Sequence, residues 1–354
     1  MKRLRVGVVG CGHNSENHLR VYSHTDGVQL VAVCDAILSR AEEKARRYGV
    51  EKALSDFNSL LKCDLDLVDI VTPTVTHGSL TQLALETGHN VLVEKPMAIS
   101  SDECLRMIRT ARKNGRTLCV VHNKRFFDSV IQARRAIDDG SLKMSRMRVT
   151  HYFAYGRFLE RWRLNEESGG LLWDAVVHPI YLTEHLMGPV SSVYAVARKV
   201  KEHAFDSFTI VLQNERIGVI EFAWNATQPL LEFQLLGEGG ESFHGNLVYD
   251  VVTRKSREDS NFGAYLLGVA AQDLHFPKAR AMRYFRNFWE IRSYPGALPF
   301  AKTFFTLIRR YLSFLRTESG NPPVPAEEGL RTVMVLEAVK SSIGSGRPQH
   351  VPVA

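Results

Sequence analysis

Residues 4–15 read Leu-Arg-Val-Gly-Val-Val-Gly-Cys-Gly-His-Asn-Ser, and this stretch decides the fold of the first third of the chain. The apolar run Leu4–Val9 leads straight into two glycines one residue apart, which predicts a buried strand, a tight turn and the start of a helix. Gly10 suits the tight turn, Gly12 lets a ligand approach the backbone, and the small Ser15 still permits close helix–strand packing. Free backbone N–H groups at such a helix start bind phosphate. The stretch therefore predicts a dinucleotide-binding turn.

Apolar strands and amphipathic helices continue to alternate as far as residue 121. Runs typical of buried parallel strands lie at Leu4–Val9, Gln29–Cys34, Leu65–Val71, Asn90–Val93 and Thr117–Val121. Helical patterns lie between them, most clearly at Ala36–Tyr48, Gly78–Thr87 and Ser100–Asn114. Parallel strands joined by helices form a doubly wound sheet. We therefore expect an α/β Rossmann domain over residues 1–121.

After Val121 the pattern changes to that of an α+β domain. Helices are expected at Asp128–Asp139 and from Asp174 to about Met187, on either side of a long strand at Arg146–Tyr155. Further strands are expected at Val190–Val200, Ser207–Gln213, Arg216–Trp224, Leu230–Leu236 and Glu241–Tyr249. Their short connections favour an open, mostly antiparallel sheet. Residues 122–354 thus form the predicted second domain, with an insertion at 251–298 and closing helices within 299–354, at about Pro299–Arg316 and Ala326–Ser342.

The composition is ordinary for a globular protein large enough for two domains. The chain has 354 residues, of which 45% are hydrophobic and 23% are charged. No apolar run reaches the roughly 18 residues of a membrane span, and the start does not resemble a signal peptide. The five cysteines form neither a CxxC pair nor a metal-ligand spacing. We expect reduced core thiols, no metal and a cytoplasmic location.

Asp35 ends the second predicted strand, 20 residues after Ser15. A carboxylate at this place accepts hydrogen bonds from the adenine ribose and repels a 2′-phosphate. We therefore expect NAD rather than NADP, with the alternative that Arg40 swings in to accept the phosphate. Cys11, His13 and Asn14 complete the predicted cofactor turn.

The loop Thr72–His77 follows the strand Leu65–Val71 and is expected to lie over the cofactor at the carboxyl edge of the sheet. Thr72, Pro73 and His77 are its candidate cofactor residues. An alternative remains open, in which Thr76 or His77 caps the helix that follows.

Two further motifs carry candidate catalytic groups. Glu94-Lys95-Pro96 follows the strand Asn90–Val93, so Glu94 and Lys95 are expected near the nicotinamide, where a lysine can polarise a substrate hydroxyl. Asp174 and His178 are four residues apart, a spacing that places both on one helix face. Imidazole titrates near neutrality and can take the alcohol proton as hydride leaves. The alternative is a helix-capping Asp174 and a core His178; the preceding Gly169-Gly170 and the upstream Lys95 favour catalysis.

These motifs together resemble the Gfo/Idh/MocA oxidoreductases, named for glucose–fructose oxidoreductase and inositol dehydrogenase. The resemblance spans nearly the whole chain and is carried by the Gly10–Ser15 turn, Asp35, Thr72-Pro73, Glu94-Lys95-Pro96, Arg125-Phe126, Trp162-Arg163, Gly169-Gly170, Asp174, His178 and the closing Ser341–Gly346 turn. It implies a Rossmann domain followed by an open-sheet domain. It also implies hydride transfer between a nicotinamide and a hydroxyl or carbonyl group of a sugar, polyol or nucleotide-sugar.

The resemblance also implies roles for individual residues. Lys95, Asp174 and His178 match the family's catalytic group. Arg125, Trp162, Arg163 and Trp173 are the candidate substrate residues, and a homodimer or homotetramer is expected. The chain departs from the family pattern at Val176, Leu171 and Trp173, where smaller residues are usual, and the added bulk weakens any transfer of a specific substrate.

A basic segment stands apart from these motifs. Nine lysines and arginines and a single acid, Glu290, lie between Lys278 and Arg316, whereas the whole chain has a net charge of +7. We interpret the segment as an amphipathic helix packed on the second domain. An alternative is contact of residues 276–316 with a phosphate-bearing substrate or an acidic membrane. No nucleic-acid motif accompanies the charge.

Two other functions remain open at this point. One is a non-catalytic, dinucleotide-sensing regulator of the same fold. The other is an enzyme that recycles a tightly bound cofactor between two sugars.

Overall fold

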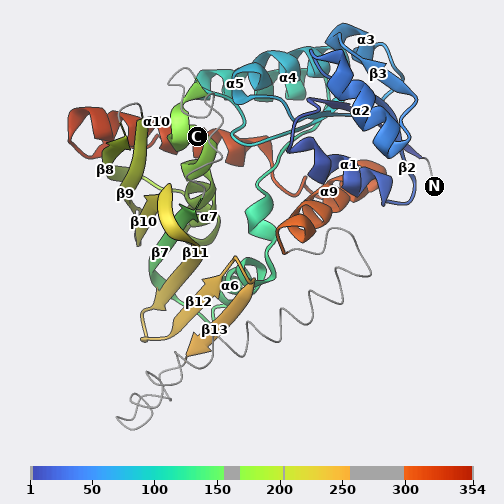
Figure 1. Cartoon of the computed structure of the whole chain (residues 1–354). Coiled ribbons are helices and arrows are strands. Elements are labelled where there is room, and N and C mark those ends of the chain that lie inside the picture. The colour runs from blue at the N-terminus through green and yellow to red at the C-terminus, as the bar shows by residue number, and fades with distance from the viewer. Residues whose placement is uncertain (1–2, 155–167, 202–203, 256–298, 353–354) are drawn as a thin grey trace.

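The chain folds around two sheets that lie side by side (Figure 1). The structure, a computed structural model, describes residues 3–154, 168–201, 204–255 and 299–352. The expected insertion at 251–298 falls largely outside these residues, but its first five residues form a strand.

The first sheet is the predicted doubly wound parallel sheet. Its strands are β1 (Leu4–Val9), β2 (Val28–Cys34), β3 (Lys52–Leu54), β4 (Leu67–Ile70), β5 (Asn90–Val93) and β6 (Leu118–Val120). They lie in the order β3-β2-β1-β4-β5-β6, and every neighbouring pair is parallel. The order reverses between β1 and β4, which is where such sheets bind ligands. Strand β3 was not predicted, because its three residues, Lys52–Leu54, do not form an apolar run.

Helices on both faces of this sheet agree with the sequence patterns. They are α1 (Ser15–Ser23), α2 (Leu38–Tyr48), α3 (Phe57–Leu61), α4 (His77–Glu86) and α5 (Ser101–Lys113), with short 3-10 turns η1 (Thr74–Thr76) and η2 (Asn123–Phe126). Local chemistry sets several ends. The Ser100 hydroxyl accepts a hydrogen bond from the N–H of Glu103 at the start of α5, and Gly49 ends α2 at a φ of 66°.

The second sheet is mostly antiparallel, as predicted. Its strands are β7 (Met144–Ala154), β8 (Ser192–Lys201), β9 (Ala204–Gln213), β10 (Ile217–Ala223), β11 (Asn225–Gly237), β12 (Ser242–Asn246), β13 (Val251–Lys255) and β14 (Gln349–His350). They run in the order β13-β12-β11-β7-β10-β9-β8-β14, with β7 and β10 parallel. The placement of residues 251–255 outside the sheet was wrong, since β13 pairs with β12.

The remaining helices cover the second sheet and connect the two halves. They are α6 (Asp128–Asp138), the π-helical turn η5 (Leu172–Val176), α7 (Val177–Met187), α9 (Pro299–Thr317) and α10 (Ala326–Ser345). Helix α10 contacts α5 on one side and α7 and β8 on the other, so it holds the two sheets together (Figure 1).

Helix α9 belongs by its packing to the first half of the molecule. Its buried side chains, among them Phe304, Ile308 and Leu312, join the core of the parallel sheet, and the helix lies beside α1 (Figure 1). The amphipathic pattern was correct, but the expectation that this helix packs on the second domain was wrong. The apolar pattern of a helix predicts that one face is buried, but it does not predict which surface that face packs against.

The basic face of α9 makes contacts within the fold. Arg309 and Arg316 donate hydrogen bonds to backbone carbonyls in the 24–27 loop that precedes β2. Lys302 forms an ion pair with Asp128 at 2.7 Å. None of the described helices has the length and hydropathy needed to cross a bilayer.

Candidate active site

The glycine turn between β1 and α1 has the form of a phosphate cradle. Gly10 has a φ of +94°, and a Cβ added there would lie 2.5 Å from the carbonyl oxygen of Val71, so the turn packs directly on the loop after β4. A Cβ on Gly12 would meet nothing within 4 Å, so the backbone is open there. The N–H groups of Gly12, His13 and Asn14 make no hydrogen bond to any residue the structure describes. Three free donors at a helix start fit a dinucleotide pyrophosphate.

Asp35 stands at the end of β2, where the sequence placed it. Its carboxylate accepts hydrogen bonds from the backbone N–H groups of Cys11, at 2.8 Å, and Ile37, at 2.9 Å. The carboxylate thus braces the glycine turn and keeps further lone pairs for ribose hydroxyls. Ile37 and Leu38 are exposed apolar side chains next to it, and the sequence reasoning missed them. Such side chains suit the faces of an adenine ring.

Beneath the turn lies a buried network that joins helix α1 to Lys95, the candidate catalytic lysine. Glu94 Oε1 accepts hydrogen bonds from Asn14 Nδ2 at 2.7 Å and from His18 Nε2 at 3.0 Å, and Glu94 Oε2 accepts one from the N–H of Lys95. His18 Nδ1 lies 2.7 Å from Asp69 Oδ2. Glu94 therefore acts by positioning Asn14 and Lys95, because its own side chain is buried.

The charges within this network stabilise one another. Burial alone would lower the pKa of His18, but the negative charges of Asp69 and Glu94 and the hydrogen bonds to them outweigh it and raise that pKa to about 10. Burial alone would raise the pKa of Glu94, but the hydrogen bond and charge of His18 and the charge of Lys95 hold it below its ordinary value. His18 is therefore an imidazolium held between the carboxylates of Asp69 and Glu94.

His77 joins two loops at the carboxyl edge of the sheet. Its ring nitrogens lie 2.8 Å from the carbonyl oxygens of Pro96 and Thr72. The side chain is only 1% exposed and joins the two loops, and a role of His77 in cofactor binding stays a prediction. The capping alternative was wrong. The N-cap of α4, Thr76, makes no side-chain cap, and its hydroxyl binds Thr72 and Pro73.

Lys95 and Asp174 meet across the two halves of the molecule. Lys95 Nζ donates to the backbone carbonyl of Asp174 at 2.7 Å and lies 3.6 Å from its carboxylate oxygen Oδ1. The peptide bond from Lys95 to Pro96 is cis. Asp174 lies in the π-helical turn η5. Between Leu171 and Ile180 the only residues that are not buried are Asp174 and His178, which are four positions apart.

His178 is connected to the site through Tyr181. Its Nδ1 lies 2.9 Å from the Tyr181 hydroxyl, and among the described residues it makes no hydrogen bond to Asp174. The tyrosine hydroxyl also lies 3.4 Å from Asn123 Oδ1. Burial, together with the nearby charges of Lys124 and Lys95, lowers the pKa of His178 well below its usual value. The imidazole is therefore neutral at physiological pH.

Lys124 is the main site residue that sequence reasoning missed. It is 4% exposed, and its Nζ lies 3.5 Å from Nε2 of His151, whose ring centroid is 6.3 Å from that of His178. Its backbone N–H donates to the Tyr181 hydroxyl. The sequence signal was a pair of adjacent cations, Lys124 and Arg125, but adjacency does not reveal which one points inward.

The structure describes two of the four candidate substrate residues, Arg125 and Trp173. Arg125 forms an ion pair with Glu328 of α10, which accounts for its charge. Trp173 is buried in the second core, packs against Gly169 and has Lys340 over its ring. Trp162 and Arg163 lie outside the described residues. A substrate role for these residues stays a prediction.

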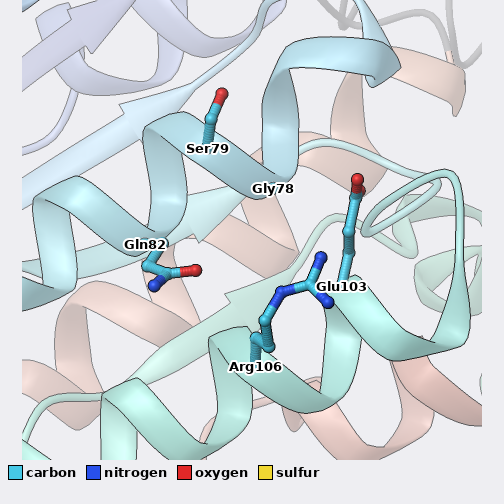
Figure 2. Close-up of a pocket in the computed structure, with 5 residues that line it drawn as sticks. All are labelled: Gly78, Ser79, Gln82, Glu103 and Arg106. Atoms are coloured by element: carbon cyan, nitrogen blue, oxygen red, sulfur yellow. The ribbon is translucent and has the colours of Figure 1, made fainter.

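A separate hollow of about 200 Å³ lies between α4 and α5 and is lined by Gly78, Ser79, Gln82, Glu103 and Arg106 (Figure 2). It shares no lining residue with the site described above. The structure's described portion contains no cluster of three or more His, Cys, Asp or Glu side chains suited to a metal ion.

Comparison with known proteins agrees with this geometry. The family model for the oxidoreductase family with an NAD-binding Rossmann fold, Gfo/Idh/MocA, matches residues 4–122. The model for the Gfo/Idh/MocA C-terminal domain matches residues 130–242. The chain belongs to the Gfo/Idh/MocA oxidoreductase family. It is therefore an oxidoreductase whose first domain binds NAD, as the glycine turn and Asp35 predicted.

Relatives within this family are named dehydrogenases. D-apiose dehydrogenase of Paraburkholderia graminis is 29% identical over 61% of this chain, and that match spans only 58% of the relative. The NAD(+)-dependent scyllo-inositol 2-dehydrogenase of Bacillus subtilis is 28% identical over 73% of this chain and 79% of the relative. The WlbA dehydrogenase of Bordetella pertussis, solved with NADH and UDP-GlcNAcA, shares the fold with a TM-score of 0.80, 21% identity and full coverage of both chains. None of these findings supports the non-catalytic regulator.

Proposed function

We propose that this protein transfers hydride between NAD(H) and a hydroxyl or carbonyl group of a sugar, polyol or nucleotide-sugar. The observation that carries the proposal is the contact of Lys95 with Asp174 at the end of the parallel sheet, with the half-buried His178 one helical turn further along. A cation, a carboxylate and a neutral imidazole at one edge suit an alcohol that loses a proton and a hydride.

The residues divide this chemistry between them. Lys95 Nζ uses one N–H on the Asp174 carbonyl and has two left to polarise a substrate oxygen. When Nδ1 of His178 donates to Tyr181, Nε2 is the acceptor that takes the hydroxyl proton. In the reverse direction the same nitrogen returns the proton to the carbonyl oxygen. Asp174 holds Lys95 in place through its carbonyl and carboxylate oxygens.

The chain's own groups also explain how the cofactor would be held. The free N–H groups after Gly10 fit the pyrophosphate, and Asp35 fits the adenine ribose. NAD supplies the hydride acceptor when bound. Asn14 and Lys95 both donate a hydrogen bond to Glu94. Glu94 therefore fixes the position of the catalytic lysine relative to the cofactor turn.

The test compares Lys95→Ala with Lys113→Ala, an exposed lysine at the end of α5. Single-turnover reduction of NAD is followed with polyols, free sugars and nucleotide sugars. We expect Lys95→Ala to lose at least about 10²-fold in turnover, the usual size of a general acid–base contribution, while NADH affinity stays within about twofold. Full turnover in Lys95→Ala would refute the assignment.

Two further parts of the proposal concern assembly and location. The outer face of β8, β9 and β10 carries exposed apolar side chains, including Val196 at 50% and Tyr194 at 40% exposure, with Val211 opposite Tyr194. An exposed apolar sheet face supports a homodimer or homotetramer.

We also propose a cytoplasmic location. Burial raises the pKa of the Cys11 and Cys119 thiols to about 12, and such buried thiols suit a reducing compartment. Weak membrane-surface contact through residues 276–316 is not part of the proposal, since Arg309 and Arg316 are engaged within the fold.

A further inference from the structure

Lys124 is a buried amine with too few partners. An ammonium group has three N–H donors. Within the described ranges, the polar contact of Lys124 Nζ is His151 Nε2 at 3.5 Å, and the ring of Phe153 lies 5.9 Å from the same nitrogen. Lys124 forms no ion pair with a described carboxylate. A buried cation without an anionic partner is costly.

The surroundings of Lys124 carry little negative charge. Lys95 repels it and Asp174 attracts it, so these two influences oppose each other. The other titratable groups facing it are His151 on β7 and His178 and Tyr181 on α7, and burial lowers the pKa of both histidines well below the ordinary value. His151 Nδ1 is itself buried without a hydrogen-bond partner. Among the described residues, Asp174 is thus the anionic group that acts on Lys124, and it forms no ion pair with it.

Lys124 is also close to the reacting groups. Its backbone N–H and the His178 ring share the Tyr181 hydroxyl, and its side chain reaches His151 beside His178. A substrate held by Lys95 and His178 therefore presents its neighbouring substituents to Lys124.

We propose that Lys124 binds a carboxylate of the substrate, so that the enzyme acts on an acidic sugar of the uronic-acid type rather than on a neutral one. This inference rests on the proposed function. The carboxylate supplies the acceptors and the counter-charge that the described residues around Lys124 do not supply. Burial and the charge of Lys95 lower the pKa of Lys124 well below its ordinary value, and a carboxylate beside the amine favours its protonated form. His151 orients the amine.

Binding is measured without turnover, from the fluorescence of the enzyme–NADH complex titrated with D-glucuronate and D-galacturonate and with D-glucose and D-galactose. We expect the acids to bind at least about 10-fold more tightly. Lys124→Met should lose roughly 30-fold or more in affinity for the acids, the effect of removing one partner of a buried charge pair, and little for the neutral sugars. Lys124→Arg should keep the preference for acids.

Calorimetry in two buffers of different ionisation enthalpy adds a second readout. Acid binding to the native protein should take up protons at pH 8, because the carboxylate raises the pKa of Lys124, and binding to Lys124→Arg should take up none, because arginine stays charged. Neutral sugars that bind as tightly as acids, or a loss in Lys124→Met that is equal for both, would overturn the inference. Preference for acids without any NAD reduction would instead refute the proposed function and leave the carboxylate site standing. NAD reduction with neutral sugars at the same rate in Lys124→Met as in the native protein would refute the carboxylate site and leave the proposed function standing.

Discussion

His18→Asn tests whether an imidazolium holds together the network beneath the cofactor turn. Each tenfold change in a proton equilibrium is worth about 1.36 kcal/mol. A pKa raised from 6.5 to about 10 in the folded protein therefore corresponds to about 5 kcal/mol, of which about 4 kcal/mol operates at pH 7. Breaking a buried ion pair by removing one partner costs a similar 3–5 kcal/mol, roughly. The pKa shift and the cost of a broken ion pair therefore both predict that His18→Asn causes a large loss in the free energy of unfolding.

The pH dependence gives the sign of the effect. Because the folded pKa is higher than the unfolded one, the contribution of His18 is complete below pH 6.5 and is lost as the pH rises through about 10. The difference between the native protein and His18→Asn should therefore be smaller by about 3 kcal/mol or more at pH 10 than at pH 7.

Urea-induced unfolding, followed by circular dichroism at pH 7 and at pH 10, measures this difference. His350→Asn is the matched control, since His350 is exposed on β14 and should leave the unfolding free energy unchanged at both pH values. A difference that is the same at pH 7 and pH 10 would mean that His18 is neutral and contributes by packing alone. That result would refute the ion network.

Three other changes give sharp outcomes. Gly10→Ala should destabilise the protein by about 2 kcal/mol or more and weaken NADH binding, because its Cβ meets the Val71 backbone, whereas Gly12→Ala should weaken NADH binding alone; equal melting temperatures for the two variants would contradict this. Asp35→Ser should raise the ratio of NADP to NAD in kcat/KM by about 10-fold or more, since it removes the charge that repels a 2′-phosphate; an unchanged ratio would show that another group selects the cofactor. Val196→Lys should shift the mass measured by light scattering toward the monomer, while Phe300→Lys, an exposed apolar residue on α9, should not; identical masses would exclude the sheet face as the interface.

Much of the fold could be predicted because its signals are local. The strands of the parallel sheet are apolar runs, and their helices end at glycines with positive φ such as Gly49 and Gly88, so hydrophobic period and turn chemistry act within a few residues. The short strands β3, β13 and β14 were not predicted, because each contains charged or polar residues and none is a continuous apolar run. Helix α9 was recognised but assigned to the wrong surface, because an apolar stripe specifies burial and not its partner.

The sequence by itself determined the cofactor turn, Asp35 and the residue types of the candidate catalytic group, because each is tied to the end of a recognisable strand or helix. Only the tertiary structure decided how these residues meet. Lys95 and Asp174 are 79 positions apart yet in contact, and His18 joins Asp69 to Glu94 across 51 and 76 positions. Which of two adjacent cations enters the site was likewise settled by packing, with Lys124 turned inward and Arg125 paired with Glu328. Charge pairing and burial depend on distances in space. The sequence pattern does not give the distance between segments that come together only when the chain folds.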